Sequence, residues 1–400
     1  MNWVLGTIGE HCTVTSSKRF HLSDRSKEGV PFFCSKEIIQ KVNGEDVTDC
    51  DYIKEEAYES VKKQYGVPEA GDLLITTRGT YGIPYIYRET DRFYFADGNL
   101  TWLKDFDDEL SARFLYYWVN SYDGQKMIDA IAKGTAQKAV PIASIKTLQI
   151  PIPPIEIQKR ISDILSVYDD LIENNQKQIK LLEEAAQRLY KEWFVDLRFP
   201  GHEDTPIVDG VPEGWQKDTV GGICSLNKET ISSEQVSKDT PYIGLEHIPR
   251  VDFCLSSWGK AGDVTSNKYR YAEDDIIFGK IRPYFHKVGF AINSGVVSTD
   301  SFVMKAQYGL WGLLLMTVFD KAFVDYTYKT CKEGAKMPRA DWKQMEKYEV
   351  LIPDKAVRSA FEDNIWSITR RIKVLAFQNL ELAEARDRLL PKLMSGEIEV

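Results

Sequence analysis

The sequence predicts an α+β protein made of two globular bodies, related by a pseudo-twofold repeat and separated by two long helices that form an antiparallel coiled coil. Three observations lead to this prediction. A motif returns at half the chain length, a long amphipathic run follows each copy, and each intervening body mixes strand-like and helix-like segments. The motif Ile150-Pro151-Ile152-Pro153 returns as Val350-Leu351-Ile352-Pro353. Such repeats indicate equivalent structural units.

The first predicted body, residues 1–154, contains strand-like segments at 72–78, 82–88 and 92–96 and a helix at 111–121. The second body, residues 215–354, repeats this order with strand-like segments at 276–282, 286–292 and 301–305 and a helix at 310–326. Sequence blocks around Trp3 and Trp215, and around Pro31 and Pro241, also correspond. We expect a small, curved, largely antiparallel sheet in each body.

The two helical runs, 155–199 and 355–400, carry apolar residues at spacings of three and four. The first run follows Pro153-Pro154 and is expected to end near Phe199-Pro200-Gly201, and the second near Ser395-Gly396. A linker rich in Pro, Gly and Asp, 200–214, leads into the second body. The residues predicted to pack between the helices are Ile161, Leu165, Ile172, Ile179, Leu182, Leu189, Phe361, Ile365, Ile372, Leu382, Leu389 and Leu393. The alternative is that each helix packs only on its own body.

Composition is typical of a soluble protein of several domains, with 43% hydrophobic and 28% charged residues in a chain of 400. The chain has no apolar run of membrane-spanning length and no export signal, so we expect a cytoplasmic protein without a membrane partner. Six cysteines without a Cys-x-x-Cys pair indicate reduced thiols, and the five scattered histidines suggest no metal site. The net charge of −9 argues against nucleic-acid binding unless basic residues gather locally.

Specific motifs lie at the ends of the helical runs. The stretches 150–161 (IPIPPIEIQKRI) and 188–201 (RLYKEWFVDLRFPG) resemble the central conserved region of the specificity subunits of type I restriction–modification enzymes. The stretch 386–398 (RDRLLPKLMSGEI) is similar to the distal conserved region of that family. Within the bodies, 71–82 (GDLLITTRGTYG) and 275–285 (DIIFGKIRPYF) resemble its target-recognition domains. The entry of the second run, 353–358 (PDKAVR), departs from the family pattern because it lacks Pro-Pro and Glu-Gln.

This resemblance implies a non-catalytic subunit of a methyltransferase and endonuclease complex. Each body would bind one half of a bipartite, asymmetric site in double-stranded DNA, and the helix pair would set the spacer and dock two methyltransferase subunits. Those subunits would hold S-adenosylmethionine, and two restriction (motor-nuclease) subunits using ATP and Mg would join them. The resemblance implies no cofactor bound by this chain.

Candidate DNA contacts lie in glycine-bearing or basic loops of both bodies. Arginine offers a fork that matches guanine or phosphate, and aromatic residues between basic ones are typical of nucleic-acid faces. The alternatives are a hairpin turn, a guarded edge strand and a solvated loop. The candidates are Arg78, Thr80, Tyr81, Lys133, Thr135, Gln137, Lys138, Lys280, Arg282, Tyr284, His286, Lys287, Lys332, Lys336 and Arg339.

Two other classes of protein compete with this interpretation. A self-sufficient DNA methyltransferase or nuclease would need a catalytic motif, and the sequence offers no Asn/Asp-Pro-Pro-aromatic loop, no G-x-G-x-x-G and no Walker motif. Asp341-Trp342-Lys343 resembles part of a metal-nuclease motif but has no clear acidic partner upstream. A structural coiled-coil adaptor is the third class, although a spacer has no need of two divergent bodies. We therefore predict no catalytic residues.

Overall fold

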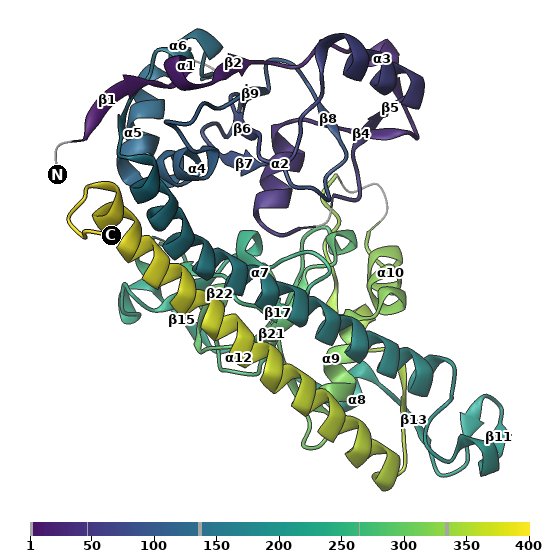
Figure 1. Cartoon of the computed structure of the whole chain (residues 1–400). Helices are drawn as coiled ribbons and strands as arrows, with labels where there is room; N and C mark the ends of the chain where they lie inside the picture. The colour runs from purple at the N-terminus through teal and green to yellow at the C-terminus, as the bar shows by residue number, and fades with distance from the viewer. Residues whose placement is uncertain (1–2, 46, 135–137, 264, 333–335) are drawn as a thin grey trace. The chain divides into compact units, whose positions relative to one another are not determined.

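The computed structural model of the chain describes residues 3–45, 47–134, 138–263, 265–332 and 336–400 (Figure 1). It divides into two compact units, which we call unit 1 (Met1–Glu173 with Glu381–Val400) and unit 2 (Asn174–Leu380). Two long helices, α7 (Ile155–Tyr190) and α12 (Lys355–Met394), each contribute to both units. No helix in the described ranges combines the length and the apolar character needed to cross a bilayer.

Unit 1 contains two four-stranded sheets and a separate strand pair. The sheet β2-β9-β6-β7 is antiparallel, whereas the sheet β3-β5-β4-β8 includes the parallel pair β4 and β8. The pair β1 and β10 joins the start of the body to the strand that precedes α7. The strands are β1 (Val4–Thr7), β2 (Thr13–Thr15), β3 (Arg25–Ser26), β4 (Val30–Phe33), β5 (Asp51–Ile53), β6 (Leu73–Thr76), β7 (Pro84–Ile86), β8 (Tyr94–Phe95), β9 (Leu100–Lys104) and β10 (Gln149–Ile152).

The main core of unit 1 forms between its first sheet, its helices and the long helices. Leu73 and Leu103 of the sheet lie in one buried cluster with Phe114, with Ile161 of α7 and with Leu393 of α12. The body of unit 1 is therefore packed directly on both long helices. The shorter helices are α1 (Ile8–His11), α2 (Ser35–Val42), α3 (Glu55–Tyr65), α4 (Ala112–Asn120), α5 (Tyr122–Ile131) and α6 (Ile142–Lys146).

Unit 2 repeats this plan with two five-stranded sheets, β14-β23-β20-β21-β17 and β15-β19-β22-β16-β18. The pair β13 and β24 corresponds to β1 and β10, and β16 and β22 are parallel, as are β4 and β8 in unit 1. The strands are β11 (Ile207–Val208), β12 (Val211–Pro212), β13 (Gln216–Thr219), β14 (Cys224–Asn227), β15 (Thr230–Ile231), β16 (Pro241–Ile243), β17 (Cys254–Leu255), β18 (Gly259–Lys260), β19 (Lys268–Tyr271), β20 (Ile276–Gly279), β21 (Val288–Ala291), β22 (Gly295–Ser298), β23 (Ser301–Ala306) and β24 (Glu349–Ile352). The expectation of one small sheet per body was wrong, because strands of two to four residues form the second sheet without a clear alternating pattern.

The shorter helices of unit 2 are α8 (Val220–Ile223), α9 (Trp311–Phe319), α10 (Lys321–Lys329) and α11 (Trp342–Met345). The single helix predicted at 310–326 is wrong, since Asp320 separates α9 from α10. The Asp320 carboxylate accepts a hydrogen bond of 2.8 Å from the Ala322 N–H and so caps the start of α10. The predicted helix at 111–121 agrees with α4, and every residue of α9 is buried.

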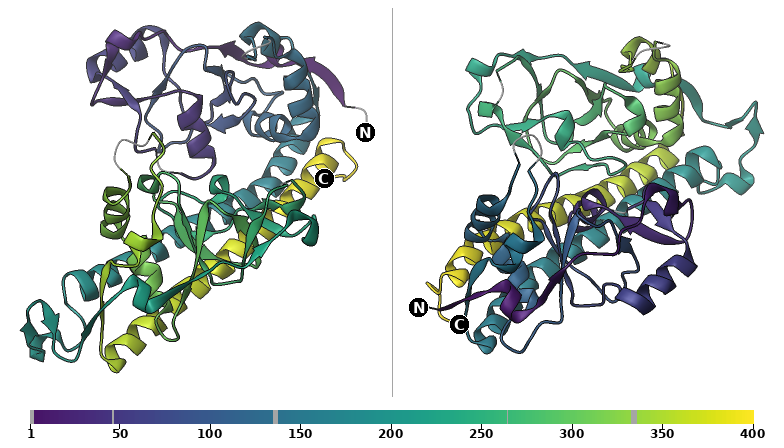
Figure 2. Two further views of the ribbon diagram at one scale, coloured as in Figure 1. Left: turned by 180° about the vertical axis from the view of Figure 1, so that it is seen from behind. Right: turned by 90° about the horizontal axis from the view of Figure 1, so that it is seen from above.

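The two long helices lie side by side within each unit (Figures 1 and 2). In unit 1 the Arg386 guanidinium of α12 lies 2.6 Å from the Asp169 carboxylate of α7. In unit 2 the aromatic rings of Trp193 and Phe194 lie 5.7 and 4.7 Å from the ring of Phe361 in α12. The first contact joins the first half of α7 to the last turns of α12, and the second joins the turn that follows α7 to the start of α12.

The structure ends the first helix earlier than the sequence predicted. α7 ends at Tyr190 and continues as a single π-helical turn, Lys191–Val195, before Leu197 takes a positive φ of 55°. Arg198 then pairs with Glu192 at 2.6 Å, so a side-chain contact closes the end of the helix before Pro200 is reached. α12 ends at Met394, next to the predicted stop at Ser395-Gly396.

The residues predicted to pack between the helices divide into two groups by burial. Ile161, Leu165, Phe361, Ile365, Ile372 and Leu393 are buried, and Ile172, Ile179, Leu182, Leu189, Leu382 and Leu389 are partly buried. Many of them share their clusters with residues of the bodies. The apolar faces therefore serve two contacts at once, helix to helix and helix to body.

Candidate nucleic-acid interface

In unit 1 the first candidate loop, Arg78–Gly82, follows the central strand β6. The Thr76 N–H donates to the Ile83 carbonyl at 3.0 Å and the Gly82 N–H donates to the Thr76 carbonyl at 2.8 Å, which closes the loop. Gly79 and Gly82 have positive φ values of 71° and 80°, a conformation that glycine adopts without strain. Arg78 and Thr80 are exposed.

A second candidate loop of unit 1 lies beside the first. Arg78 and Ala139 form a β-bridge, and Lys133 and Ala139 exchange backbone hydrogen bonds of 2.8 and 2.9 Å. The two exposed lysines Lys133 and Lys138 are therefore brought next to Arg78. Thr135 and Gln137, which were also predicted to contact DNA, lie outside the described residues.

Asp129 of α5 joins the two loops of unit 1. It accepts a hydrogen bond from the Tyr81 hydroxyl, and its Oδ1 lies 3.1 Å from the Lys138 ammonium. The Tyr81 hydroxyl and the Lys138 ammonium lower the pKa of the Asp129 carboxyl. Part of the positive charge of this face is thus balanced within unit 1, whereas no ion pair of Arg78 is found among the described residues.

Unit 2 brings its two candidate segments together in the same way. Ile281 and Arg339 form a β-bridge, the Arg282 N–H donates to the Pro338 carbonyl at 2.8 Å, and the Ala340 N–H donates to the Lys280 carbonyl at 2.8 Å. Lys332 and Lys336 are exposed, and Arg339 pairs with Asp300 at 2.7 Å. In both units, therefore, the loop after the central strand is bridged to the segment that follows α5 or α10.

Three predicted contact residues of unit 2 have partners inside the body. Lys280 Nζ donates to the Thr299 carbonyl at 2.7 Å, Lys287 Nζ to the Leu245 carbonyl at 2.5 Å, and His286 Nε2 to the Phe319 carbonyl at 2.6 Å. Burial lowers the pKa of all three groups. Each of these three side chains can therefore contact DNA only through a donor or acceptor that is not used in these bonds.

Two aromatic residues of the run 280–287 lie at the surface side of the loop. Tyr284 is 45% exposed, and its ring lies 5.2 Å from that of Tyr328 in α10. Phe285 lies under Arg250, whose guanidinium is 4.0 Å from the centre of the phenyl ring. Sequence reasoning missed Arg250, because it stands alone in its own segment and only the fold brings it to the loop.

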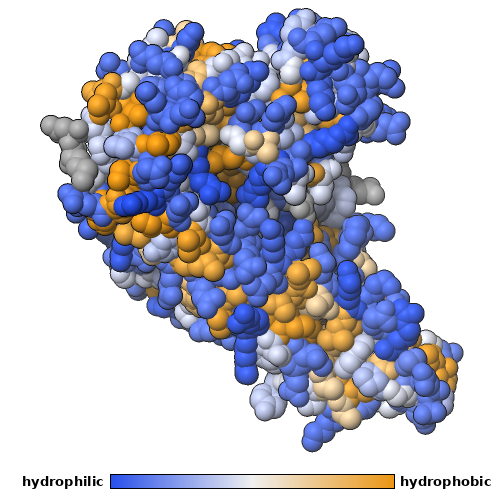
Figure 3. Space-filling view, in the orientation of Figure 1, coloured by the Kyte–Doolittle hydropathy of each residue, from blue (hydrophilic) through white to orange (hydrophobic). Residues whose placement is uncertain are grey.

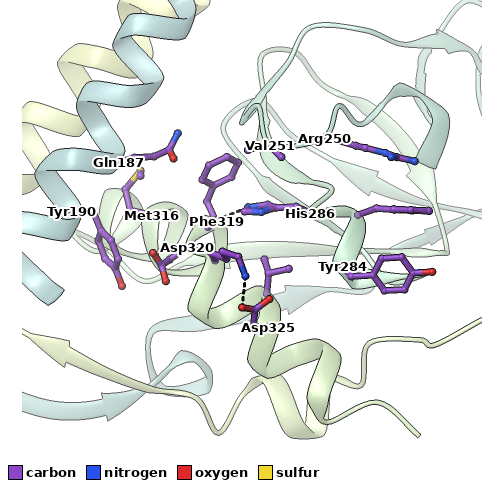
Figure 4. Close-up of a pocket in the computed structure, with 13 residues that line it drawn as sticks. Gln187, Tyr190, Arg250, Val251, Tyr284, His286, Met316, Phe319, Asp320 and Asp325 are labelled. Carbon is purple, nitrogen blue, oxygen red and sulfur yellow. Dashed lines mark hydrogen bonds and ion pairs between the residues drawn. The ribbon is translucent and has the colours of Figure 1, made fainter. Parts of the chain in front are cut away.

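A cavity of about 510 Å³ lies behind this loop, within unit 2 (Figure 4). Gln187 and Tyr190 of α7 line one end and Arg250 and Tyr284 the other, with His286 between them. The described residues contain no cluster of His, Cys, Asp or Glu that could hold a metal ion, and all six cysteines are free thiols. The arrangement thus provides basic and aromatic side chains at a surface of unit 2.

Known proteins that resemble this chain include subunits named for DNA specificity. Residues 1–184 match the family described as the Type I restriction modification DNA specificity domain. The MjaIX specificity subunit of a type I restriction enzyme from Methanocaldococcus jannaschii is 25% identical over 354 residues, covering 82% of this chain and 78% of that protein. The HindI specificity subunit from Haemophilus influenzae is 24% identical over 345 residues, covering 68% and 74%.

A solved structure shares the fold. The S subunit of a type I restriction–modification system from M. genitalium has a TM-score of 0.61 and 17% sequence identity, and the match covers 98% of this chain and 96% of that one. Residues 1–184 therefore resemble this specificity domain, most of the chain is similar in sequence to type I specificity subunits, and the whole chain shares its fold with one solved S subunit.

Proposed function

We propose that the chain is the DNA-recognition subunit of a type I restriction–modification complex and that each of its two bodies reads one half of a bipartite, asymmetric site in double-stranded DNA. The observation that carries this proposal is the shared construction of the two candidate interfaces. The bridge between Arg78 and Ala139 in unit 1 has its counterpart between Ile281 and Arg339 in unit 2. One backbone arrangement with different side chains suits two related tasks, the reading of two different half-sites.

The long helices would form an antiparallel coiled coil that sets the distance between the half-sites. Support comes from the contacts of α7 with α12 inside each unit, Asp169 with Arg386 and Tyr190 with Phe361. A stiff helical spacer fixes the distance at about 1.5 Å per residue. In this proposal residues 1–154 and 215–354 are the recognition domains, 155–199 and 355–400 the conserved helices, and 200–214 the linker.

Two methyltransferase subunits carrying S-adenosylmethionine would dock on the helices, and two restriction subunits using ATP and Mg would complete the complex. Apolar side chains are exposed along α7 and α12 (Figure 3). In unit 1 these include Ile164, Val167 and Leu171, which are 36%, 55% and 45% exposed and share one face of α7. Exposed apolar stripes of this kind mark protein contacts.

The host genome provides the most direct test of DNA recognition. Methylated adenines would be mapped in strains with and without the gene, and one bipartite motif is expected to disappear with it. Exchanging residues 1–154 for those of a relative should change one half of that motif and leave the other half intact. A change in both halves would contradict the assignment of one body to each half-site.

The spacer and the absence of catalysis are tested separately. Lengthening α7 and α12 by matched helical turns should widen the gap between the half-sites, and an unchanged gap would refute the spacer. The purified chain alone, supplied with S-adenosylmethionine or with Mg and ATP, should neither methylate nor cleave DNA. Either activity in the isolated chain would favour a self-sufficient enzyme.

A further inference from the structure

The loops that follow β6 and β20 can be aligned residue by residue from their hydrogen bonds. The bond from the Thr76 N–H to the Ile83 carbonyl corresponds to the bond of 2.8 Å from the Gly279 N–H to the Lys287 carbonyl. The β-bridges formed by Arg78 and by Ile281 correspond as well. Counted from the bridges, Gly79 is equivalent to Arg282. Counted from the closing bonds, Gly82 is equivalent to His286.

Unit 2 therefore places side chains where unit 1 has glycines. Arg282 and His286 have φ values of 51° and 52°, close to the left-handed values of Gly79 and Gly82. A side chain in this conformation costs free energy that glycine does not. Such strain at two positions of one loop points to a role for the side chains themselves.

The loop also gathers positive charge without neutralising it. The guanidinium groups of Arg250 and Arg282 lie 4.0 and 5.7 Å from the centre of the same ring, that of Phe285. Across the described ranges, neither arginine forms an ion pair with a carboxylate, whereas the neighbouring Arg339 does. The Arg282 Nε is buried and has no hydrogen-bond partner among the described atoms. Two cations on one ring without a counter-charge leave N–H donors available to an external acceptor.

The second left-handed residue, His286, bonds to the segment of Arg250 and to the end of α9. Its carbonyl accepts a hydrogen bond of 3.2 Å from the Val251 N–H, and its Nε2 donates to the Phe319 carbonyl. The first of these bonds holds the segment of Arg250 against the loop, and Figure 4 shows Arg250 and Tyr284 at the same end of the cavity, away from α7. These two bonds therefore link the loop to the segment of Arg250 and to α9.

We propose that Arg250, Phe285 and Arg282 form the reading centre of the second half-site. Arg282 binds the O6 and N7 of a guanine in the major groove through its fork, Arg250 holds a neighbouring phosphate, and Phe285 supports both. Arginine is the side chain best matched to guanine at this edge. Unit 1 has glycine at the position of Arg282, so the two half-sites are read with different chemistry. This inference rests on the proposed function.

The test selects sequences from a random duplex DNA library with the full chain and then measures affinity for the selected duplex. Arg282→Gly keeps the backbone conformation and removes the strain, so its melting temperature should be unchanged or higher. Its affinity should fall about 5- to 150-fold, and one guanine of the second half-site should no longer be selected. Arg250→Gln should weaken binding to all sequences alike and reduce the salt slope by about one.

Asp209→Gly is the matched control, since Asp209 also has a left-handed φ, of 50°, in an exposed turn of unit 2. It should gain stability without any change in the selected sequence. If the unaltered chain selects a bipartite sequence and Arg282→Gly selects the same one with equal affinity, the reading centre is wrong but the proposed function stands. If the unaltered chain selects no sequence, both are overturned.

Discussion

The two bodies are attached to the long helices by different buried polar groups. In unit 1 the Gln158 amide of α7 accepts a hydrogen bond of 2.8 Å from the Ser111 N–H and donates to the carbonyls of Glu109 and Pro153. In unit 2 the Glu362 carboxylate of α12 accepts bonds of 2.8 and 2.9 Å from the N–H groups of Gly312 and Leu313.

A second carboxylate of unit 2, that of Glu183 in α7, accepts bonds of 3.0 and 3.1 Å from the N–H groups of Phe253 and Cys254. The backbone groups around each side chain determine whether an amide or a carboxylate suits the position. An amide suits a mixture of N–H and carbonyl groups, whereas a carboxylate suits N–H groups alone. At these buried positions, unit 2 uses ionisable carboxyl groups and unit 1 uses a neutral amide. Burial raises the pKa of the Glu362 carboxyl and raises that of Glu183 to about 8.

Removing the Glu362 carboxylate should have the largest effect. Glu362→Ala leaves two buried N–H groups at the start of α9 without acceptors and opens a cavity, and we expect the free energy of unfolding of unit 2 to fall by about 4 kcal/mol. Hydrogen exchange of the Gly312 and Leu313 amides, with urea unfolding, measures this loss. Glu362→Gln keeps an acceptor and should lose far less. Equal losses in both variants would show that the carbonyl oxygen is not what holds α9.

Glu183→Gln should remove a pH dependence from the stability of unit 2. The folded-state pKa of about 8 lies above the ordinary value of 4.5, so the folded state binds the extra proton between these pH values. The free energy of unfolding of the unaltered chain should therefore fall as the pH rises from about 4.5 to 8. The glutamine variant should become relatively more stable by about 3 kcal/mol between pH 5 and pH 8.

Parallel urea titrations of the two proteins at pH 5, 6, 7 and 8 measure that difference. The neighbouring Asp252 carboxylate contributes to the raised pKa, and the N–H groups of Phe253 and Cys254 oppose it. A difference between the two proteins that stays constant over this range would mean that Glu183 is ionised throughout.

Gln158→Ala should destabilise unit 1 by about 2 kcal/mol, since it removes the acceptor of the partly buried Ser111 N–H and the donor to the carbonyls of Glu109 and Pro153. The substitution Gln158→Glu tests whether a carboxylate can replace the amide at this position. A carboxylate there would face the carbonyls of Glu109 and Pro153, so the loss of stability should grow as the pH rises from 5 to 8. Urea unfolding at both pH values decides this, and a pH-independent result would argue against the distinction between amide and carboxylate.

The smallest expected effect concerns the contact between the helices in unit 1. Arg386 and Asp169 are both partly exposed, so Arg386→Ala should lower the free energy of unfolding by about 1 kcal/mol, less at high salt. The Tyr117 hydroxyl, which donates to Asp169 at 2.6 Å, retains part of the network. Arg388→Ala is the control, because Arg388 is largely exposed and should change stability by less than about 0.5 kcal/mol.

The internal repeat predicted much of the fold. The equivalence of the Trp3 and Trp215 blocks agrees with the matching positions of α1 and α8, and the repeated Ile-Pro motif agrees with β10 and β24. The second sheet of each body and the break at Asp320 were missed. Strands of two or three residues leave too little pattern to detect, and the capping side chain of Asp320 acts over only two residues.

The candidate site was predicted in part. The loops around Arg78 and Arg282 were chosen for their composition, but their β-bridges to Ala139 and Pro338–Arg339 join segments that lie far apart in the chain. Arg250 had no local signal at all. The partners of Lys280, His286 and Lys287 inside the body were equally beyond reach, since a basic side chain looks the same in sequence whether it faces solvent or a carbonyl.

The sequence alone established the internal repeat and the two long helices. These follow from repetition and from apolar spacing, which are properties of neighbouring residues. Only the tertiary structure decided which polar groups are buried, which arginines lack a counter-charge and which side chain takes a left-handed backbone. These depend on groups that the chain brings together from distant positions, and the free energy of a charge or a hydrogen bond is set by that surrounding rather than by the residue type.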